Sequence, residues 1–256
     1  MKKVALIAML VTTVLAFGQT SPPSNQALVL VGGAVYVSPT EAPIRDGVVL
    51  VQGTKIAAVG TRAQLRIPGG SQVIDCSGLT ITSGFWNSHV HFFERKWTNA
   101  AAIPAPELGR QLEETITRYG FTSVFDLGST WENTRRIRAR IDAGEVPGPR
   151  ILSTGDGLIP AGGAPSETVV SMMGATMTPL HEIADAAQAS AASKKVLEQG
   201  VDGLKLFVSA QRGATLPESA VQAAVDESHR MGRPVFAHPN TGTDVLTAVR
   251  RLQTPR

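Results

Sequence analysis

The sequence contains a single cysteine, Cys76, among 256 residues. One cysteine cannot close an internal disulfide, so the fold must be held together by its core. Within its Val-Ile-Asp-Cys-Ser-Gly turn we expect a half-buried small residue, with a reactive thiol as the alternative. Long apolar runs are also missing, since none reaches the roughly 20 residues that a membrane-spanning helix needs. With 18% charged and 43% hydrophobic residues, the composition excludes a disordered or fibrous chain.

A large excess of charge of either sign is absent as well, because the formal net charge is +3. The basic residues are scattered, apart from a short run within a segment that we expect to be helical: Arg135, Arg136, Arg138 and Arg140. Such a run could contact phosphates, but a solvated helix face explains it better. The sequence therefore predicts no nucleic-acid partner.

The N-terminus has the three parts of a secretory signal peptide. Lys2 and Lys3 precede an apolar run over residues 4–17, and small residues at positions 16 and 18 suit a cleavage site. We predict a signal peptide over residues 1–18, a flexible leader over 19–26, and export to the periplasm or the extracellular space. An uncleaved membrane anchor is the alternative, but the short run argues against stable membrane insertion.

Residues 27–83 consist of short runs rich in Val and Ile, separated by Gly- and Pro-containing turns. Such a pattern is typical of a small all-β unit without a helix. The expected strands cover residues 27–32, 34–37, 47–52, 55–59 and 72–75.

From residue 84 onward, strand-like runs alternate with amphipathic segments. The expected strands are 84–91, 122–127, 150–154, 203–208 and 234–238, and the expected helices are 105–119, 130–143, 183–199 and 217–231. A Gly stops each of these helices. This alternation predicts an α/β fold with parallel strands, either a barrel or an open doubly wound sheet. A long insertion over residues 160–179 follows the third strand, on the side where a barrel carries its active site.

Three of these strands carry residues that suit a metal centre. His89 and His91 close the first strand, and because side chains alternate, both imidazoles face the same way, with Val90 opposite. Lys205 lies within the fourth strand, where a buried lysine must be neutral, paired or modified. His238 ends the fifth. Alone, these residues could be a surface pair, a snorkelling lysine and a hydrogen-bonding histidine; in a barrel their strand ends converge.

Two motifs resemble the entry to the catalytic barrel in the amidohydrolase superfamily, especially its secreted imidazolonepropionase-like and prolidase-like branch. The motifs are Val-Ile-Asp-Cys-Ser-Gly at residues 73–78 and Thr-Ser-Gly-Phe-Trp-Asn-Ser-His-Val-His at residues 82–91. The resemblance implies a β-sandwich over residues 27–83 and a TIM (β/α)8 barrel from residue 84, of which residues 84–256 would supply about five βα units.

The resemblance also implies a metal centre with two divalent ions, usually zinc. His89 and His91 would bind the first ion, Lys205 would bridge both ions as a carboxylated lysine, and His238 would bind the second. The expected activity is hydrolysis of an amide, a cyclic amide or a dipeptide by metal-activated water. The expected partner is a small amide- or peptide-like substrate, and homo-oligomer formation is left open.

The sequence departs from the family pattern in two respects. Asn87 stands where many members have Asp, which should change the support of the ligands more than metal binding. The family also places a His on strand six and a catalytic Asp on strand eight, and neither occurs before Arg256. We therefore expect no catalytic Asp in these residues, and an isolated chain that is unstable and inactive. A truncated fragment or a binding remnant of such an enzyme is the alternative.

The other two histidines and two strand-end aspartates are better explained by roles in the fold than by roles in the site. His229 lies in the last turn of a predicted helix, where a helix C-terminus favours it. His181 borders the insertion and is expected at the surface, with a substrate contact as the alternative. Asp126 and Asp156, at the ends of the second and third strands, are weaker candidates for substrate contact, because such carboxylates also cap turns.

Overall fold

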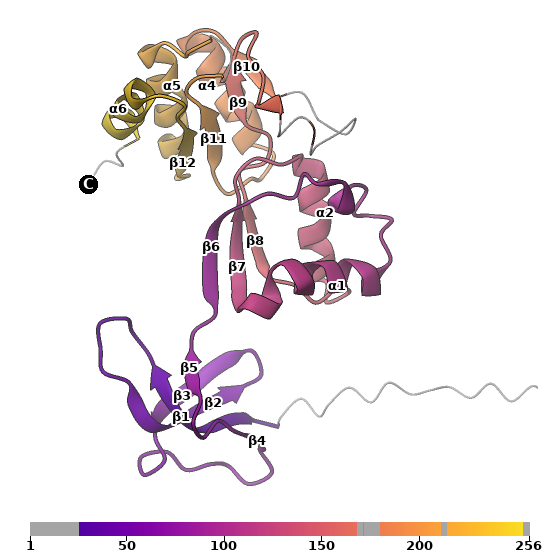
Figure 1. Cartoon of the computed structure of the whole chain (residues 1–256), viewed down its shortest axis with the longest axis vertical. Coiled ribbons are helices and arrows are strands. Elements are labelled where there is room, and N and C mark those ends of the chain that lie inside the picture. Colours follow the sequence, from indigo (N-terminus) through magenta and orange to yellow (C-terminus); the bar gives the residue numbers. More distant parts are fainter. Residues whose placement is uncertain (1–25, 168–170, 172–179, 211–213, 253–256) are drawn as a thin grey trace, which may run out of the picture. The chain divides into compact units, whose positions relative to one another are not determined.

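A computed structural model describes residues 26–167, 171, 180–210 and 214–252 (Figure 1). The predicted signal peptide, nearly all of the predicted leader and much of the insertion over 160–179 lie outside the described residues. The chain divides into two compact units, the first ending at Ser83 and the second beginning at Gly84. Among the residues that the structure describes, no helix is both long and apolar enough to cross a membrane.

The first unit is a five-stranded sheet built around its longest strands. β1 (Leu28–Tyr36), β2 (Ile44–Gln52) and β3 (Lys55–Thr61) pair antiparallel in chain order. β4 (Gln72–Asp75) and β5 (Thr80–Thr82) pair parallel to the beginning and the end of β1. The described residues of this unit form one sheet, so the second layer that a sandwich requires is not among them.

The two strands predicted at residues 27–32 and 34–37 are one strand, β1, with an irregular pairing register at its Gly-Gly pair. Gly32 has φ = 88°, and a Cβ there would lie 2.6 Å from Ser77 Oγ, so a side chain would be both strained and crowded. Alternate β1 residues are buried: Val29 and Val31 form a small core with Val48. Cys76 is buried rather than half-buried, with 6% of its surface exposed.

The second unit is α/β, as predicted, with two parallel sheets (Figure 1). The first sheet has the order β6 (Phe85–Val90), β7 (Phe121–Asp126), β8 (Arg150–Ser153). The second has the order β10 (His181–Ile183), β9 (Leu158–Pro160), β11 (Leu204–Phe207), β12 (Val235–His238). The helices are α1 (Ala105–Thr115), α2 (Trp131–Asp142), α4 (Ala186–Leu197), α5 (Glu218–Arg230) and α6 (Gly242–Arg251), with 3-10 turns η1 (Arg95–Trp97) and η2 (Thr117–Tyr119).

Two hydrogen bonds bring the end of β8 to the segment that leads into β11. The backbone N–H of Asp202 donates to the carbonyl of Ser153 at 2.7 Å. The Asp202 side chain in turn accepts the backbone N–H of Ser153 at 3.0 Å. The strands that carry the predicted ligands, β6, β11 and β12, are thereby connected within one compact unit.

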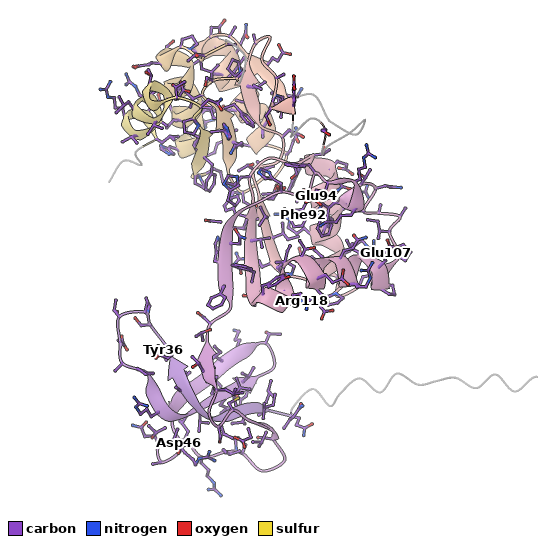
Figure 2. The ribbon with its side chains drawn as sticks, in the orientation of Figure 1. Tyr36, Asp46, Phe92, Glu94, Glu107 and Arg118 are labelled. Atoms are coloured by element: carbon purple, nitrogen blue, oxygen red, sulfur yellow. The ribbon has the colours of Figure 1, made fainter. Side chains whose placement is uncertain are left out.

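Each sheet of this unit has its own hydrophobic core. The first includes Phe92, which is labelled in Figure 2. Its ring packs edge-to-face on Trp97 with centroids 5.2 Å apart. In the second, Leu204 and Leu206 of β11 are fully buried among residues of α4 and α5. Each such side chain contributes about 2 kcal/mol on burial. Because side chains alternate along a strand, the core that holds Leu204 and Leu206 directs Lys205 to the opposite face of β11.

Candidate metal centre

The end of β6 brings two imidazole rings together. The Nε2 atoms of His89 and His91 are 3.2 Å apart, whereas Val90 between them packs with the first core. Two nitrogen ligands about 2.0–2.1 Å from one tetrahedral ion lie roughly 3.3 Å apart. The spacing of this pair therefore fits two ligands of one cation. Asn87, which replaces the expected Asp, accepts the backbone N–H of His89 at 3.1 Å and so supports this end of the strand.

The ring orientation of His91 is set by a backbone carbonyl. Its Nδ1 lies 3.1 Å from the carbonyl oxygen of Gly128. A carbonyl can only accept, so Nδ1 carries the proton and the lone pair of neutral His91 is on Nε2, facing His89. Burial lowers the pKa of His91 to about 4, which leaves the ring neutral at pH 7. Burial also lowers the pKa of His89, and the nearby charges of Lys205 and His238 add to this.

Lys205 is a buried cation, and no anionic side chain among the described residues is in contact with it. Only 2% of the surface of Lys205 is exposed, and its Nζ lies 5.5 Å from the ring centroid of Phe207. No other described residue forms a hydrogen bond or an ion pair with this amine. Burial lowers the pKa of Lys205 to about 8, against the opposing charge of Asp126. At pH 7 roughly one tenth of the amine is therefore neutral.

His238 ends β12 beside Phe207 of β11, with which it is in register. The two rings have centroids 5.2 Å apart. Burial lowers the pKa of His238, and the charge of Lys205 lowers it further. Lys205 thus lies close enough to act electrostatically on all three predicted histidine ligands.

The four predicted ligands are brought into one region, but only the histidine pair is at ligand spacing. Across the described part of the chain, no three or more His, Cys, Asp or Glu side chains gather closely enough to hold a metal ion. The assembled group is therefore His89 and His91, with Lys205 and His238 nearby. Lysine becomes a metal ligand only when it is neutral or modified, and burial of Lys205 favours the neutral form.

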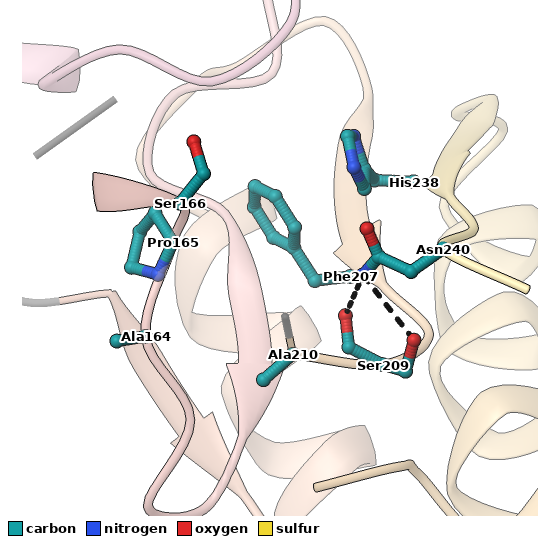
Figure 3. A pocket seen from close by; sticks show the side chains of 8 residues that line it. All are labelled: Ala164, Pro165, Ser166, Phe207, Ser209, Ala210, His238 and Asn240. Carbon is teal, nitrogen blue, oxygen red and sulfur yellow. Dashed lines mark hydrogen bonds between the residues drawn. The ribbon is translucent and has the colours of Figure 1, made fainter. Parts of the chain in front are cut away.

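A cavity of about 120 Å³ opens beside His238 (Figure 3). The ring of Phe207 forms one wall, and the hydrogen-bonded side chains of Ser209 and Asn240 form another. Apart from His238, no side chain in the lining is titratable, so the cavity suits a small uncharged group. The lining consists of Ala164, Pro165, Ser166, Phe207, Ser209, Ala210, His238 and Asn240.

The structure argues against a substrate contact for Asp126, because this residue is wholly buried. Its carboxylate accepts hydrogen bonds from the hydroxyls of Ser129, Ser153 and Thr134. These hydroxyl residues were not singled out in the sequence, because Ser and Thr are common and come here from three separate segments.

The other polar residues considered in the sequence, His229, His181 and the arginine run, lie in regular secondary structure. His229 lies in the last turn of α5 and His181 begins β10. Within the arginine run of α2, Arg135 pairs with Glu132, and Arg138 pairs with Asp202 at 2.7 Å. These ion pairs account for the run without a phosphate ligand.

Comparison with solved structures finds three similar proteins that match over most of this chain. It matches a putative prolidase from Bifidobacterium longum over 89% of this chain and 53% of that chain, with 22% identity and a TM-score of 0.68. A prolidase complexed with N-methylphosphonate-L-proline matches over 88% and 59%, with 26% identity and a TM-score of 0.66. A structure described as an amidohydrolase matches over 88% and 59%, with 23% identity and a TM-score of 0.68.

No protein-family model and no curated protein matches the sequence. The chain spans 53% to 59% of the length of these three solved structures.

Proposed function

We propose that this chain, whose fold over about 89% of its length is that of the amidohydrolase superfamily, belongs to a hydrolase that cleaves carbon–nitrogen bonds. The observation that carries the proposal is the pair of imidazole Nε2 atoms 3.2 Å apart at the end of β6. The pair lies in the same region as a buried lysine and a further strand-end histidine. Solved structures named prolidase and amidohydrolase, similar over most of the chain, support the same reaction class.

The residues that would hold a divalent metal, zinc being the expected one, are His89, His91, Lys205 and His238. His91 is neutral, and its Nε2 lone pair faces His89, so it suits this role without any change of protonation. When bound, a divalent cation at this place supplies Lewis acidity, which activates water and polarises a substrate carbonyl.

Lys205 would act in its carboxylated form. The neutral amine attacks CO₂, a C–N bond forms, and one proton leaves to solvent, which gives a carbamate anion. This reaction turns an unpaired buried cation into an anion, the charge that a site for two cations needs. The low pKa of about 8 supports it, because the neutral amine is the reactive form.

The cavity beside His238 would take the small uncharged part of the substrate, whose scissile amide would face the histidine pair. A volume of about 120 Å³ suits a group of a few heavy atoms, such as a small aliphatic side chain or ring. The absence of charged side chains in its lining argues against a charged group at this position.

Three wider proposals accompany this function. The second unit would be part of a (β/α)8 barrel, and residues 27–83 would contribute to a β-sandwich. The protein would be exported after cleavage of the peptide over residues 1–18. Its substrate would be a small amide, cyclic amide or dipeptide.

The direct test compares two His→Ala variants of the intact protein, supplied with zinc and bicarbonate. His91→Ala removes a proposed ligand; His229→Ala, in the last turn of α5, is the matched control. Metal per protein is measured by mass spectrometry, and amine release is measured with X-Pro dipeptides and N-acyl amino acids. We expect His91→Ala to lose its metal and on the order of a thousandfold in rate, equivalent to about 4 kcal/mol, with the control unchanged. A wild type that binds no divalent metal and releases no amine would refute the function and favour a binding remnant.

A further inference from the structure

Asp126 is a buried carboxylate for which the proposed reaction has no use. It ends β7, is inaccessible to solvent and bonds to three hydroxyl groups, at distances of 2.6 to 2.9 Å. Burial raises its pKa to about 6. An ionised group at this place costs stability, and its three hydrogen bonds offset part of that cost.

The turn that follows Asp126 is bonded, residue by residue, to the end of β6. The N–H of Leu127 donates to the carbonyl of Val90 at 3.0 Å. The carbonyl of Gly128 accepts from His91 Nδ1 at 3.1 Å. The hydroxyl of Ser129 accepts the N–H of Phe92, the residue after His91, at 2.7 Å.

Asp126 orients the Ser129 hydroxyl that accepts the last of these bonds. A serine hydroxyl has one proton, and Ser129 donates it to Asp126 Oδ1 at 2.6 Å. Its lone pairs are then free to face the N–H of Phe92. Thr134 from α2 and Ser153 from β8 both donate to Oδ2, which holds the carboxylate itself from two further elements.

We propose that Asp126 is a positioning residue, which acts through Ser129 to hold the backbone at Phe92, directly after His91, and so keeps Nε2 of His91 aimed at His89. The carboxylate and the hydroxyl fix Phe92, the Gly128 carbonyl fixes the ring, and Leu127 fixes Val90. The statement that His91 binds a metal rests on the proposed function. The statement that Asp126 positions His91 is independent of it.

Two hydroxyl deletions at the same carboxylate separate positioning from stability. Ser129→Ala removes the link between Asp126 and Phe92. Thr134→Val, at a fully buried position, removes a hydrogen bond of similar length to the other carboxylate oxygen without touching the turn. Both variants should unfold at a lower urea concentration than the wild type, with similar shifts of the midpoint.

The first readout needs no metal. ¹⁵N NMR of the His91 ring in the metal-free intact protein should show the Nδ1–H tautomer in the wild type and in Thr134→Val. In Ser129→Ala we expect a mixture that includes the Nε2–H tautomer. The second readout is the Kd for Zn²⁺ or Co²⁺ by calorimetry, which should rise at least tenfold in Ser129→Ala and stay within about twofold in Thr134→Val.

Equal effects of the two variants on the tautomer and on Kd, or no change in the tautomer of Ser129→Ala, would overturn the inference. Should Ser129→Ala fail to fold, Ser129→Cys keeps the volume with a much weaker acceptor and should give the same tautomer mixture. If the wild type binds neither metal, the proposed function fails, whereas the tautomer comparison still decides the role of Asp126.

Discussion

Two buried aspartates lie near predicted ligands of the same centre, yet their surroundings shift their pKa values in opposite directions. The carboxylate of Asp126, the last residue of β7, accepts hydrogen bonds only from hydroxyls, and burial raises its pKa to about 6. Asp244, in the first turn of α6, has 2% of its surface exposed. Burial opposes its ionisation as well, but hydrogen bonds from the Ser209 hydroxyl and from the backbone at Asn240 and Thr241 outweigh it and lower its pKa.

The difference shows what a buried carboxylate needs in order to stay charged. Asp244 is the third residue of α6 and completes a capping box with Thr241, so it meets backbone N–H groups and the positive end of the helix. Asp126 ends a strand and has neither. The ionised form of Asp126 therefore destabilises the fold near His91, whereas the ionised form of Asp244 stabilises the segment that follows His238.

Replacing Asp126 by Asn should have the largest effect. The folded-state pKa of this acid is raised from 3.8 to about 6, so the folded protein holds the proton more tightly than the unfolded chain does. Stability contributed by the protonated group is therefore lost as pH rises from about 4 to about 6, by about 3 kcal/mol. Urea unfolding of the metal-free protein at pH 4 to 7 should show this fall in the difference in unfolding free energy between the wild type and Asp126→Asn, since other titrating groups such as His91 act alike in both proteins. Parallel curves would contradict the proposed ionisation of Asp126.

Lys205→Met should stabilise the metal-free protein while removing a proposed ligand. The folded-state pKa of Lys205 is lowered from 10.5 to about 8, so its charged form destabilises the fold at pH 7. We expect a gain of about 2 kcal/mol at pH 7 that becomes several times smaller by about pH 10, where the lysine is neutral in the folded state and begins to lose its proton in the unfolded state. Thermal unfolding at both pH values measures it. A variant less stable than wild type at pH 7 would mean that an unseen anion pairs with Lys205.

Asp244→Asn should have the smallest effect and the opposite pH dependence. The pKa of Asp244 is lowered, so its contribution is present above the unfolded value of 3.8 and is lost as pH falls through the folded value. At pH 7 the variant should lose about 1 kcal/mol, typical of a helix N-terminal carboxylate, and should converge with the wild type in acid. A loss of stability that does not change with pH would show that shape, and not charge, is what Asp244 supplies.

Much of the α/β unit could be predicted from the sequence, because its signals are local. The strands β6, β11 and β12 lie within two residues of their predicted bounds, since buried parallel strands are apolar runs bordered by Gly or Pro. Gly120, Gly144, Gly200 and Gly232, predicted to stop helices, all have positive φ. The convergence of His89 and His91 followed from strand alternation alone.

The parts that could not be predicted depend on contacts between distant segments. β9 and β10 have three residues each and exist through their pairing with each other, across the insertion. The partners of Asp126 come from residues 3, 8 and 27 positions further along the chain. A hydroxyl in the sequence gives no sign of which carboxylate it will meet, so this network required the structure.

The central claim is that the pair at the end of β6 binds a metal together with Lys205 and His238. Its most direct test is a crystal structure of the intact protein grown with zinc and bicarbonate, with diffraction data recorded on both sides of the zinc absorption edge. The account predicts an anomalous peak about 2.0–2.1 Å from Nε2 of both His89 and His91, and density for a carbamate on Lys205. An unmodified Lys205 and no anomalous peak beside the two histidines would contradict it.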